Sequence, residues 1–233
     1  MNTGFQFKQF FVKHDRCAMK VGTDGVLLGA WCPSRSAILD VGTGSGLIAL
    51  MLAQRCPDAQ IDAIDIDEEA VAQAHDNFAA SPWADRLHIA QCALQEWQGK
   101  DYDLIVSNPP YFVNSLKNPD AARRTARHND TLPFSELMAE SARRLAPDGT
   151  VALIVPAEAE QELQTLAHQH GLQCTHRCYV HPKPERPAKR VMMAWQRPSA
   201  SAIIGESITH LTLEDDHAHR SPAYQQLTRD FYL

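Results

Sequence analysis

The fold of this chain is decided by the stretch Ala37-Ile38-Leu39-Asp40-Val41-Gly42-Thr43-Gly44-Ser45-Gly46. Its apolar first half predicts a buried strand, and its alternating glycines predict a tight turn that opens a helix over 44–55. Glycines in such a turn also let the backbone approach a ligand where a Cβ would collide. The stretch therefore predicts a strand, a turn and a helix with a ligand site above the turn.

The rest of the chain repeats this alternation of strand and helix. Helices are predicted over 68–80, 133–145 and 157–170, a turn over 147–149, and further strands over 60–66, 87–91, 103–107, 150–155, 172–179 and 191–196. Strands separated by helices form a parallel sheet that is covered on both faces. The pattern thus predicts an α/β, Rossmann-like fold with seven strands, mostly parallel, and helices on both faces.

Two further features of the organisation follow from this pattern. The last two predicted strands have no helix between them, so we expect an antiparallel strand at one edge of the sheet. We predict one domain over 35–197, a head over 1–34 that lies above the ligand site, and a tail over 198–233 that packs on the domain.

The composition is that of an ordinary globular protein, with 44% hydrophobic and 21% charged residues among 233, which excludes disorder, collagen and coiled coil. The longest uncharged stretch, 41–54, is too short and too polar to span a membrane, and no apolar signal segment follows Met1. The six cysteines form no C-x-x-C pair, and those over 174–181 are spaced as in a strand. We therefore expect a reduced, cytoplasmic protein with no metal and no membrane partner, as a monomer or weak dimer.

An acidic residue closes the second predicted strand. Asp65 comes 19 residues after Gly46, at a place where a carboxylate can accept hydrogen bonds from both ribose hydroxyls of an adenosine. Asp40, the glycine turn and Asp65 all fall within one strand-helix-strand unit. Together they predict a nucleoside-binding site more strongly than a glycine-rich turn alone does.

A second motif, Asn108-Pro109-Pro110-Tyr111, follows the predicted strand over 103–107. In open α/β sheets, ligands bind outside the carboxyl ends of the strands, which is where this motif and the glycine turn both lie. The Asn108 side-chain carbonyl and the Pro109 backbone carbonyl are two acceptors on a stiff backbone, and they suit a planar amino group with two N–H donors. Tyr111 can stack on the ring that carries this amine.

The two motifs together resemble those of class I S-adenosylmethionine-dependent methyltransferases that modify amino groups. The head is more specific. Its stretches over 7–12 and 19–31, together with Ser81-Pro82-Trp83 and the closing Phe231-Tyr232-Leu233, resemble the bacterial tRNA1(Val) (adenine-37-N6)-methyltransferase family. The resemblance covers nearly the whole chain, and it implies a class I methyltransferase sheet.

The resemblance also implies roles for particular residues. Catalytic roles fall on Asn108, Pro109, Pro110 and Tyr111. Residues implied to bind S-adenosylmethionine are Lys20, Thr23, Asp24, Asp40, Gly42, Gly44, Gly46, Asp65, Ile66, Ala93 and Asn108. Ala93 departs from the family pattern, since such enzymes usually carry there an acidic residue that accepts from the cofactor's adenine amine.

The net charge of −6 conceals an uneven distribution. Residues 57–86 hold eight acidic side chains against one basic side chain, Arg86, whereas 177–197 hold six basic side chains against Glu185. Basic stretches of this kind suit RNA phosphates, although a solvated basic face without a ligand is the alternative. Residues predicted to bind the RNA substrate are Tyr111, Arg123, Arg124, Arg127, Lys183, Lys189 and Arg190.

We therefore predict an enzyme that transfers a methyl group from S-adenosylmethionine to N6 of an adenine in tRNA, at adenine 37 of tRNA1(Val). A protein-glutamine N5-methyltransferase is one alternative, because an amide amine suits the same two acceptors; the 34 residues before the first strand leave no room for that family's helical domain. Another rRNA or DNA amino-methyltransferase is a second alternative. A cofactor-binding or RNA-binding module without turnover is a third, and the intact Asn108 and prolines disfavour it.

Overall fold

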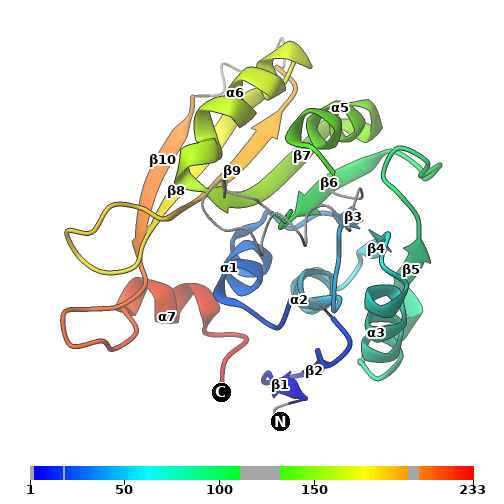
Figure 1. Cartoon of the computed structure of the whole chain (residues 1–233), viewed down its shortest axis with the longest axis horizontal. Helices are drawn as coiled ribbons and strands as arrows, with labels where there is room; N and C mark the ends of the chain where they lie inside the picture. Colours follow the sequence, from blue (N-terminus) through cyan, green and yellow to red (C-terminus); the bar gives the residue numbers. More distant parts are fainter. Residues whose placement is uncertain (1–2, 18, 111–131, 199–204) are drawn as a thin grey trace, which may run out of the picture.

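The computed structural model describes residues 3–17, 19–110, 132–198 and 205–233. Their main sheet contains β3 (Ala37–Val41), β4 (Gln60–Asp65), β5 (Leu87–Gln91), β6 (Tyr102–Ser107), β7 (Leu145–Pro156), β8 (Gln173–His181), β9 (Arg190–Gln196) and β10 (Ser207–Thr212). Within the described residues the order across this sheet is β10-β8-β9-β7-β6-β3-β4-β5 (Figure 1). All strands except β9 run parallel to one another.

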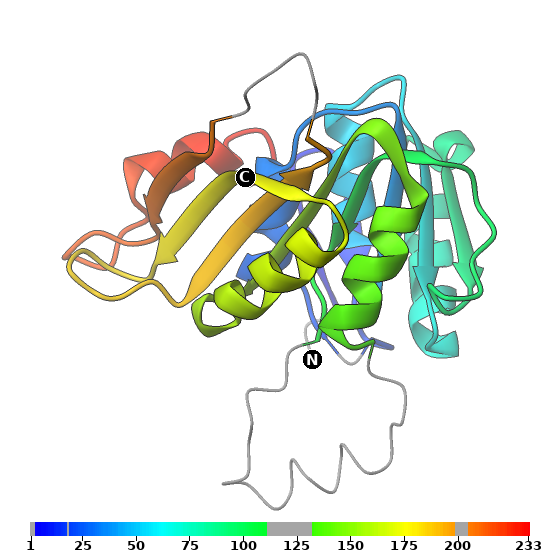
Figure 2. The ribbon, with the colours of Figure 1, turned by 90° about the horizontal axis from the view of Figure 1, so that it is seen from above.

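Helices cover both faces of this sheet. They are α1 (Thr23–Trp31), α2 (Leu47–Arg55), α3 (Glu68–Ala79), α5 (Phe134–Arg144), α6 (Glu160–Gln169) and α7 (Pro222–Thr228), with short 3₁₀ turns η1 (Ala84–Arg86) and η2 (Ala157–Ala159). Figure 2 shows α5 and α6 in front of the sheet and α7 behind it. Buried side chains of α1, α2, α3 and α7 form one core, and those of α5 and α6 form the other.

The central strand β3 supplies both cores. Ile38 packs with α1 and α2, whereas the next residue, Leu39, packs with α5, because successive strand residues point to opposite faces. Both side chains are fully buried. A strand buried on both faces lacks apolar–polar alternation, which is why the sequence shows a continuous apolar run there.

The head and the tail meet on one side of the molecule. A hairpin of β1 (Gly4–Gln6) and β2 (Phe11–Lys13) begins the described chain, and the Lys8 amide donates to the Phe231 carbonyl at 2.8 Å. The ring of Phe7 stacks on the ring of Tyr232, with 6.0 Å between their centroids. The two ends of the chain accordingly lie close together in Figure 1.

The α/β class, the mostly parallel sheet and the seven predicted strands are confirmed, but two details of the predicted sheet were wrong. The antiparallel strand is not at the edge: β9 lies between β7 and β8 and is antiparallel to both. Its residues Val191–Trp195 are all buried, as expected of an interior strand. The edge strand beyond β8 is β10, an eighth strand, which has four exposed residues at its start and so lacks a hydrophobic signal.

The turn predicted over 147–149 lies inside a strand. Strand β7 already begins at Leu145, opposite Tyr102, but the next paired residues are Leu104 and Thr150. Residues 146–149 therefore form an irregularity in the ladder, where extra residues bulge out of one strand. Pro147 and Gly149 favour such a local departure from the ladder as readily as they favour a free turn.

Arg86 ties the end of α2 to the adjoining strand. Its guanidinium donates to the carbonyls of Ala53, Cys56 and Ala59, at 2.9, 3.0 and 2.9 Å. A cation at a helix carboxyl end satisfies carbonyls that the helix leaves unpaired and opposes the negative end of the helix dipole.

We expect Arg86→Ala to lower the free energy of unfolding by about 2–3 kcal/mol, since three charge-assisted hydrogen bonds are lost at a half-buried site. Arg86→Lys should recover only part of this, because one ammonium cannot reach all three carbonyls. Arg35→Ala is the matched control, since among the described residues Arg35 donates only to the adjacent Ser34 carbonyl, at 3.0 Å. Urea unfolding measures all three variants, and equal losses for Arg86 and Arg35 would contradict the assignment.

Candidate functional site

A cavity of about 920 Å³ lies at the carboxyl ends of the parallel strands. The turn after β3, the end of β4, the loop after β5 and the start of the segment after β6 all contribute to it. The predicted residues that line it are Gly42, Gly44, Asp65, Ile66, Ala93, Asn108, Pro109 and Pro110. The structure thus brings the two sequence motifs to one site.

Asp65 holds the glycine turn at the floor of this cavity. Its Oδ2 accepts from the Gly44 amide at 2.8 Å, and its Oδ1 accepts from the Asp67 amide at 3.0 Å. Each carboxylate oxygen can accept more than one hydrogen bond, so Asp65 retains acceptor capacity toward the cavity. The neighbouring Ile66 side chain is 44% exposed and offers an apolar surface beside this carboxylate.

Asp40 fixes the same turn from below and does not line the cavity. The carboxyl group is fully buried, and its Oδ2 accepts from the Thr43 hydroxyl at 2.6 Å and the Ala49 amide at 3.2 Å. Its Oδ1 has no hydrogen-bond partner among the described residues. Burial raises the pKa of Asp40 to about 7, although the bonds from Thr43 and Ala49 oppose this rise.

The glycines of the turn have different roles. Gly44 has φ +57°, and a Cβ built on it would meet nothing within 4 Å, because that position faces the open cavity. Gly46 has φ +79°, and a Cβ there would lie 2.4 Å from Cε1 of the buried Phe78 on α3. Gly46 therefore allows close packing of turn and helix, and it does not line the cavity.

Asn108 brings an unused acceptor to the cavity. Its Oδ1 is buried and has no hydrogen-bond partner within the described part of the chain. The preceding residue, Ser107, donates its hydroxyl to the Val41 carbonyl at 2.7 Å, which links the end of β6 to β3. A buried, unpaired carbonyl oxygen is costly unless a ligand donor satisfies it, so this atom marks the place for an N–H or O–H group.

The remaining predicted residues are placed as follows. Lys20, Thr23 and Asp24 are not among the described residues that line the cavity. Asp24 accepts from Arg190 Nε at 2.8 Å, and Lys183 lies 3.8 Å from a Glu214 carboxylate oxygen. Lys189 is exposed in the loop before β9. Tyr111, Arg123, Arg124 and Arg127 lie outside the described residues.

The cavity also has lining residues that the sequence reasoning missed. From the head it takes Cys17 and Met19, and from the segment after β5 and from α5 it takes Gln95, Glu96 and Glu136. The Gln95 side-chain amide donates to Glu136 and so joins two walls of the cavity. Met19 begins the stretch over 19–31 that carries the family resemblance, but no local motif marks the other residues, since they meet only after the chain folds.

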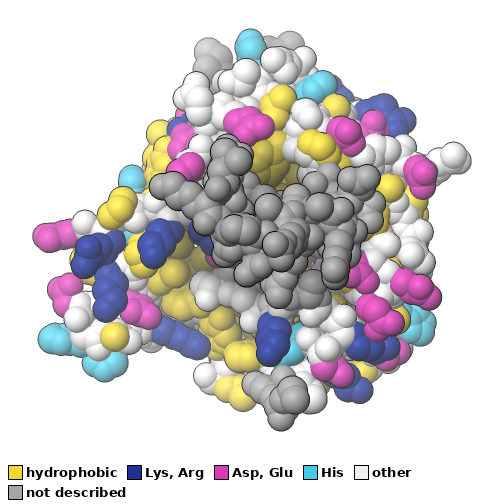
Figure 3. Space-filling model, in the orientation of Figure 1, with side chains coloured by type: hydrophobic (Ala, Val, Ile, Leu, Met, Phe, Trp, Pro, Cys, Tyr) yellow, Lys and Arg dark blue, Asp and Glu magenta, His cyan; other side chains and the backbone are white. Residues whose placement is uncertain are grey.

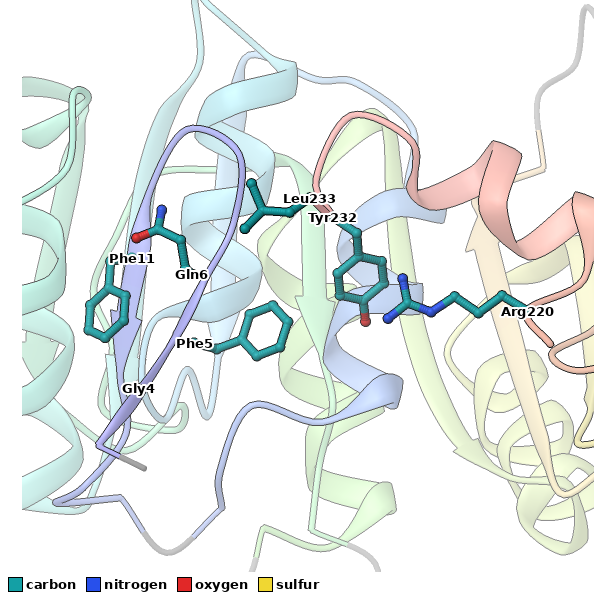
Figure 4. A pocket seen from close by; sticks show the side chains of 7 residues that line it. All are labelled: Gly4, Phe5, Gln6, Phe11, Arg220, Tyr232 and Leu233. Carbon is teal, nitrogen blue, oxygen red and sulfur yellow. The ribbon is translucent and has the colours of Figure 1, made fainter. Parts of the chain in front are cut away.

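A second hollow, of about 450 Å³, lies between the head hairpin and the closing residues (Figure 4). Phe5, Phe11 and Tyr232 line it together with Arg220, whose guanidinium lies 4.1 Å from the centroid of the Tyr232 ring. None of the residues of the two sequence motifs lines this hollow. The cavity at the strand ends is therefore the candidate active site.

Comparison with known proteins identifies the family. A family model described as "Methyltransferase small domain" matches residues 22–177. A tRNA1(Val) (adenine(37)-N6)-methyltransferase of Parabacteroides distasonis is 48% identical, over 100% of this chain and 98% of that protein. A protein of the same name from Aeromonas hydrophila is 47% identical over the same shares. The chain belongs to this methyltransferase family.

A solved structure supports the fold of this family member. A predicted O-methyltransferase from Agrobacterium tumefaciens has a TM-score of 0.67 and 17% identity, with 89% of this chain and 96% of that chain covered. At this identity the likeness shows the fold alone. Across the described part of the chain, no helix has the length and apolar character needed to cross a membrane.

S-adenosylmethionine, the methyl donor of class I methyltransferases, fits the residues of the cavity. The space above Gly44 leaves the backbone open to close approach, and Asp65 presents carboxylate oxygens suited to ribose hydroxyls. The apolar side chains of Ile66 and Leu94 line the same cavity and suit a flat purine ring. Ala93, where the family pattern has an acidic residue, also lines it but contributes no carboxylate.

Substitutions of Gly44 and Gly46 should separate the effect on ligand binding from the effect on stability. We expect Gly44→Ala to weaken binding of S-adenosylhomocysteine at least tenfold, because its Cβ enters the cavity, while the left-handed backbone costs about 1–2 kcal/mol of stability. Gly46→Ala should cost more stability, about 2–4 kcal/mol, because its Cβ also collides with Phe78. Calorimetry and urea unfolding measure both effects, and unchanged ligand affinity in Gly44→Ala would argue against a ligand above this turn.

The buried carboxyl group of Asp40 should make stability depend on pH. Its pKa is about 7 in the folded chain and 3.8 in the reference state, so the folded state keeps this proton to a higher pH. The free energy of unfolding should therefore fall as pH rises from about 4 to about 7, by up to about 1.4 kcal/mol per pH unit from this group. Asp40→Asn should lack this part of the slope. Parallel slopes for the two proteins in urea unfolding would disprove the assignment.

Proposed function

We propose that this chain transfers a methyl group from S-adenosylmethionine to the exocyclic N6 amine of an adenine in tRNA, at adenine 37 of tRNA1(Val). The single observation that carries the reaction type is the buried, unpaired Oδ1 of Asn108 at the cavity. The substrate follows from relatives named tRNA1(Val) (adenine(37)-N6)-methyltransferase that match 98–100% of this chain at 45–48% identity.

The chain's own residues position the amine. The Asn108 Oδ1 and the Pro109 carbonyl accept its two N–H groups, so its lone pair is held in a defined direction. S-adenosylmethionine supplies an electrophilic methyl group on a sulfonium, and this needs an aligned nucleophile more than acid–base assistance. Proline at 109 and at 110 limits backbone motion beside Asn108. The methylated amine is strongly acidic and loses its proton to water.

The predicted binding roles complete the proposal. Gly42, Gly44 and Asp65 hold the cofactor, and Ile66 and Ala93 line its adenine side. Tyr111 stacks on the target adenine. Phosphates are contacted by the basic side chains Arg123, Arg124, Arg127, Lys183, Lys189 and Arg190, where Arg190 also pairs with Asp24. The head over 1–34 covers the cavity through Cys17 and Met19. The tail over 198–233 packs on the domain over 35–197 through Tyr224 and Phe231.

We also propose a compartment, an oligomeric state and a metal content for the enzyme. We take it as cytoplasmic, as a monomer or weak dimer, and without a metal ion. All six cysteines are free thiols, which suits a reducing compartment. A protein-glutamine N5-methyltransferase would use the same two acceptors, but the full-length relatives carry the tRNA name.

Methylation of defined RNAs tests this function. The purified chain and S-adenosylmethionine are incubated with unmodified transcripts of tRNA1(Val) and of a variant with guanine at position 37, and nucleosides are analysed by mass spectrometry. We expect N6-methyladenosine in the first transcript only. Equal methylation of both transcripts would reject position 37, and transfer to a glutamine peptide but to neither RNA would favour the alternative.

Asn108 should be required for transfer and dispensable for cofactor binding. We expect Asn108→Ala to lower kcat at least 100-fold, because one of the two acceptors that aim the amine is lost. Binding of S-adenosylhomocysteine, measured by calorimetry, should change little, and this serves as the control for folding. Turnover close to that of the wild type would remove Asn108 from the mechanism.

A further inference from the structure

A row of packed rings lies on the outer part of the sheet, away from the cavity. The Tyr179 ring stacks on His210, with 5.3 Å between centroids and an interplanar angle of 25°, and the His181 ring lies beside His210, edge to edge, with 5.2 Å between centroids and 32° between planes. Tyr179 and His181 are alternate residues of β8, and His210 is the register partner of Tyr179 on β10. All three rings therefore stand on one face of the sheet.

Hydrogen bonds fix these rings in place. The His181 Nδ1 lies 2.7 Å from the Arg186 carbonyl, which only accepts, so His181 donates from Nδ1. Its Nε2, 3.0 Å from His210 Nδ1, then accepts in the neutral state, and His210 donates. At the other end, Tyr179 donates to Glu160 at 2.9 Å. The rings are thus held rigidly, while His210 itself is exposed.

This assignment leaves His210 Nε2 as a hydrogen-bond acceptor at the surface. Among the described residues no donor reaches it. The exposed His210 ring thus stacks on Tyr179 with one face and meets His181 at its edge. Exposed rings of this kind are the surfaces on which unpaired nucleic-acid bases stack.

The charges around the rings suit a polyanion. The loop over 182–190, which includes the first residue of β9, has four basic residues and one acidic residue. Lys183 pairs with Glu214 and Arg190 with Asp24, whereas Arg186 and Lys189 make no ion pair within the described residues. Of the nearby carboxylates, those of Glu160 and Glu206 are bound by Arg177 and that of Glu214 lies 3.8 Å from Lys183, while Asp215 and Asp216 follow on the loop after β10. Figure 3 shows Lys and Arg side chains, with some acidic groups and histidines among them, over the loops after β8 and β10.

The register of the strands places the rings relative to Asn108. Ser107 pairs with Leu153, and two residues further on Val155 pairs with Val191, Val191 with Tyr179, and Tyr179 with His210. His210 and Pro109 are therefore at the same position along the strand direction, near the carboxyl ends of the parallel strands. Four steps between neighbouring strands separate β6 from β10, about 19 Å in all. A stacked strand advances about 3.4 Å per nucleotide, so a few nucleotides span this distance.

We propose that the rings of Tyr179, His210 and His181, with the loop over 182–190, form a second RNA contact that receives an unpaired nucleotide a few positions from the target adenine. The inference rests on the proposed function, because it takes RNA as the substrate at Asn108. The base stacks on the exposed face of His210. Arg186 and Lys189 contact the adjoining phosphates.

The test measures the affinity of the full-length chain for an unmodified tRNA1(Val) transcript, with S-adenosylhomocysteine present. His210→Ala should weaken it about tenfold, because one base loses its stacking partner. His210→Phe should retain most of the affinity, since it keeps a ring. His88→Ala, an exposed histidine on the distant strand β5, is the matched control and should bind like the wild type. Lys189→Ala should reduce the salt dependence of binding by about one phosphate contact.

The outcomes separate the two proposals. A wild-type chain that methylates the transcript, with His210→Ala and Lys189→Ala both within twofold of its affinity and unchanged in salt dependence, overturns the second contact alone. A wild-type chain that binds S-adenosylhomocysteine but neither binds nor methylates the transcript overturns the proposed function and this inference together. An elevated KM for tRNA with unchanged kcat in His210→Ala supports the inference.

Discussion

The hydrogen bond from the Gly44 amide to Asp65 is the contact on which the site depends. It joins the turn after β3 to the end of β4, so the glycine backbone and the carboxylate are fixed relative to each other. Asp40 fixes the same turn from the opposite side, through Thr43 and Ala49. The turn is thus held between two carboxylates, one buried beneath it and one at the cavity. A ligand meets a preformed surface and does not have to order the turn itself.

The parallel sheet extends this constraint to the acceptor side of the reaction. Asn108 lies at the end of β6, the direct neighbour of β3, and Ser107 bonds to the Val41 carbonyl at the end of β3. The glycine turn and Asn108 therefore follow neighbouring strands, at the carboxyl ends of the parallel strands. Methyl transfer requires the donor carbon and the acceptor nitrogen in line, and rigid neighbouring strands supply such alignment better than loops do.

The sequence was sufficient for the features that depend on local pattern. Continuous apolar runs marked the interior strands, and the glycine and Asn-Pro-Pro motifs marked the strand ends that form the cavity. Sequence patterns were not sufficient for features that depend on contacts between distant parts of the chain. Strand β10 is polar for most of its length and exists because it pairs with β8, and Cys17 and Met19 reach the cavity only through the packing of the head. Gly46, predicted to bind the cofactor, also approaches Phe78 closely, a contact far along the chain that no local pattern indicates.

The order of the strands also explains how an acidic protein can offer a surface to RNA. The acidic residues over 57–86 belong to β4, α3 and the turn before β5, at one end of the sheet, whereas the basic loop over 182–190 joins β8 to β9 near the other end. Five strand steps separate β4 from β8, about 24 Å, which is more than twice the distance over which salt screens exposed charges. The two regions therefore act almost independently. The acidic end lies beside the site proposed for a cationic cofactor, and the basic end lies along the proposed RNA path. Asn108 follows β6, which lies between the two ends, where the two substrates must meet.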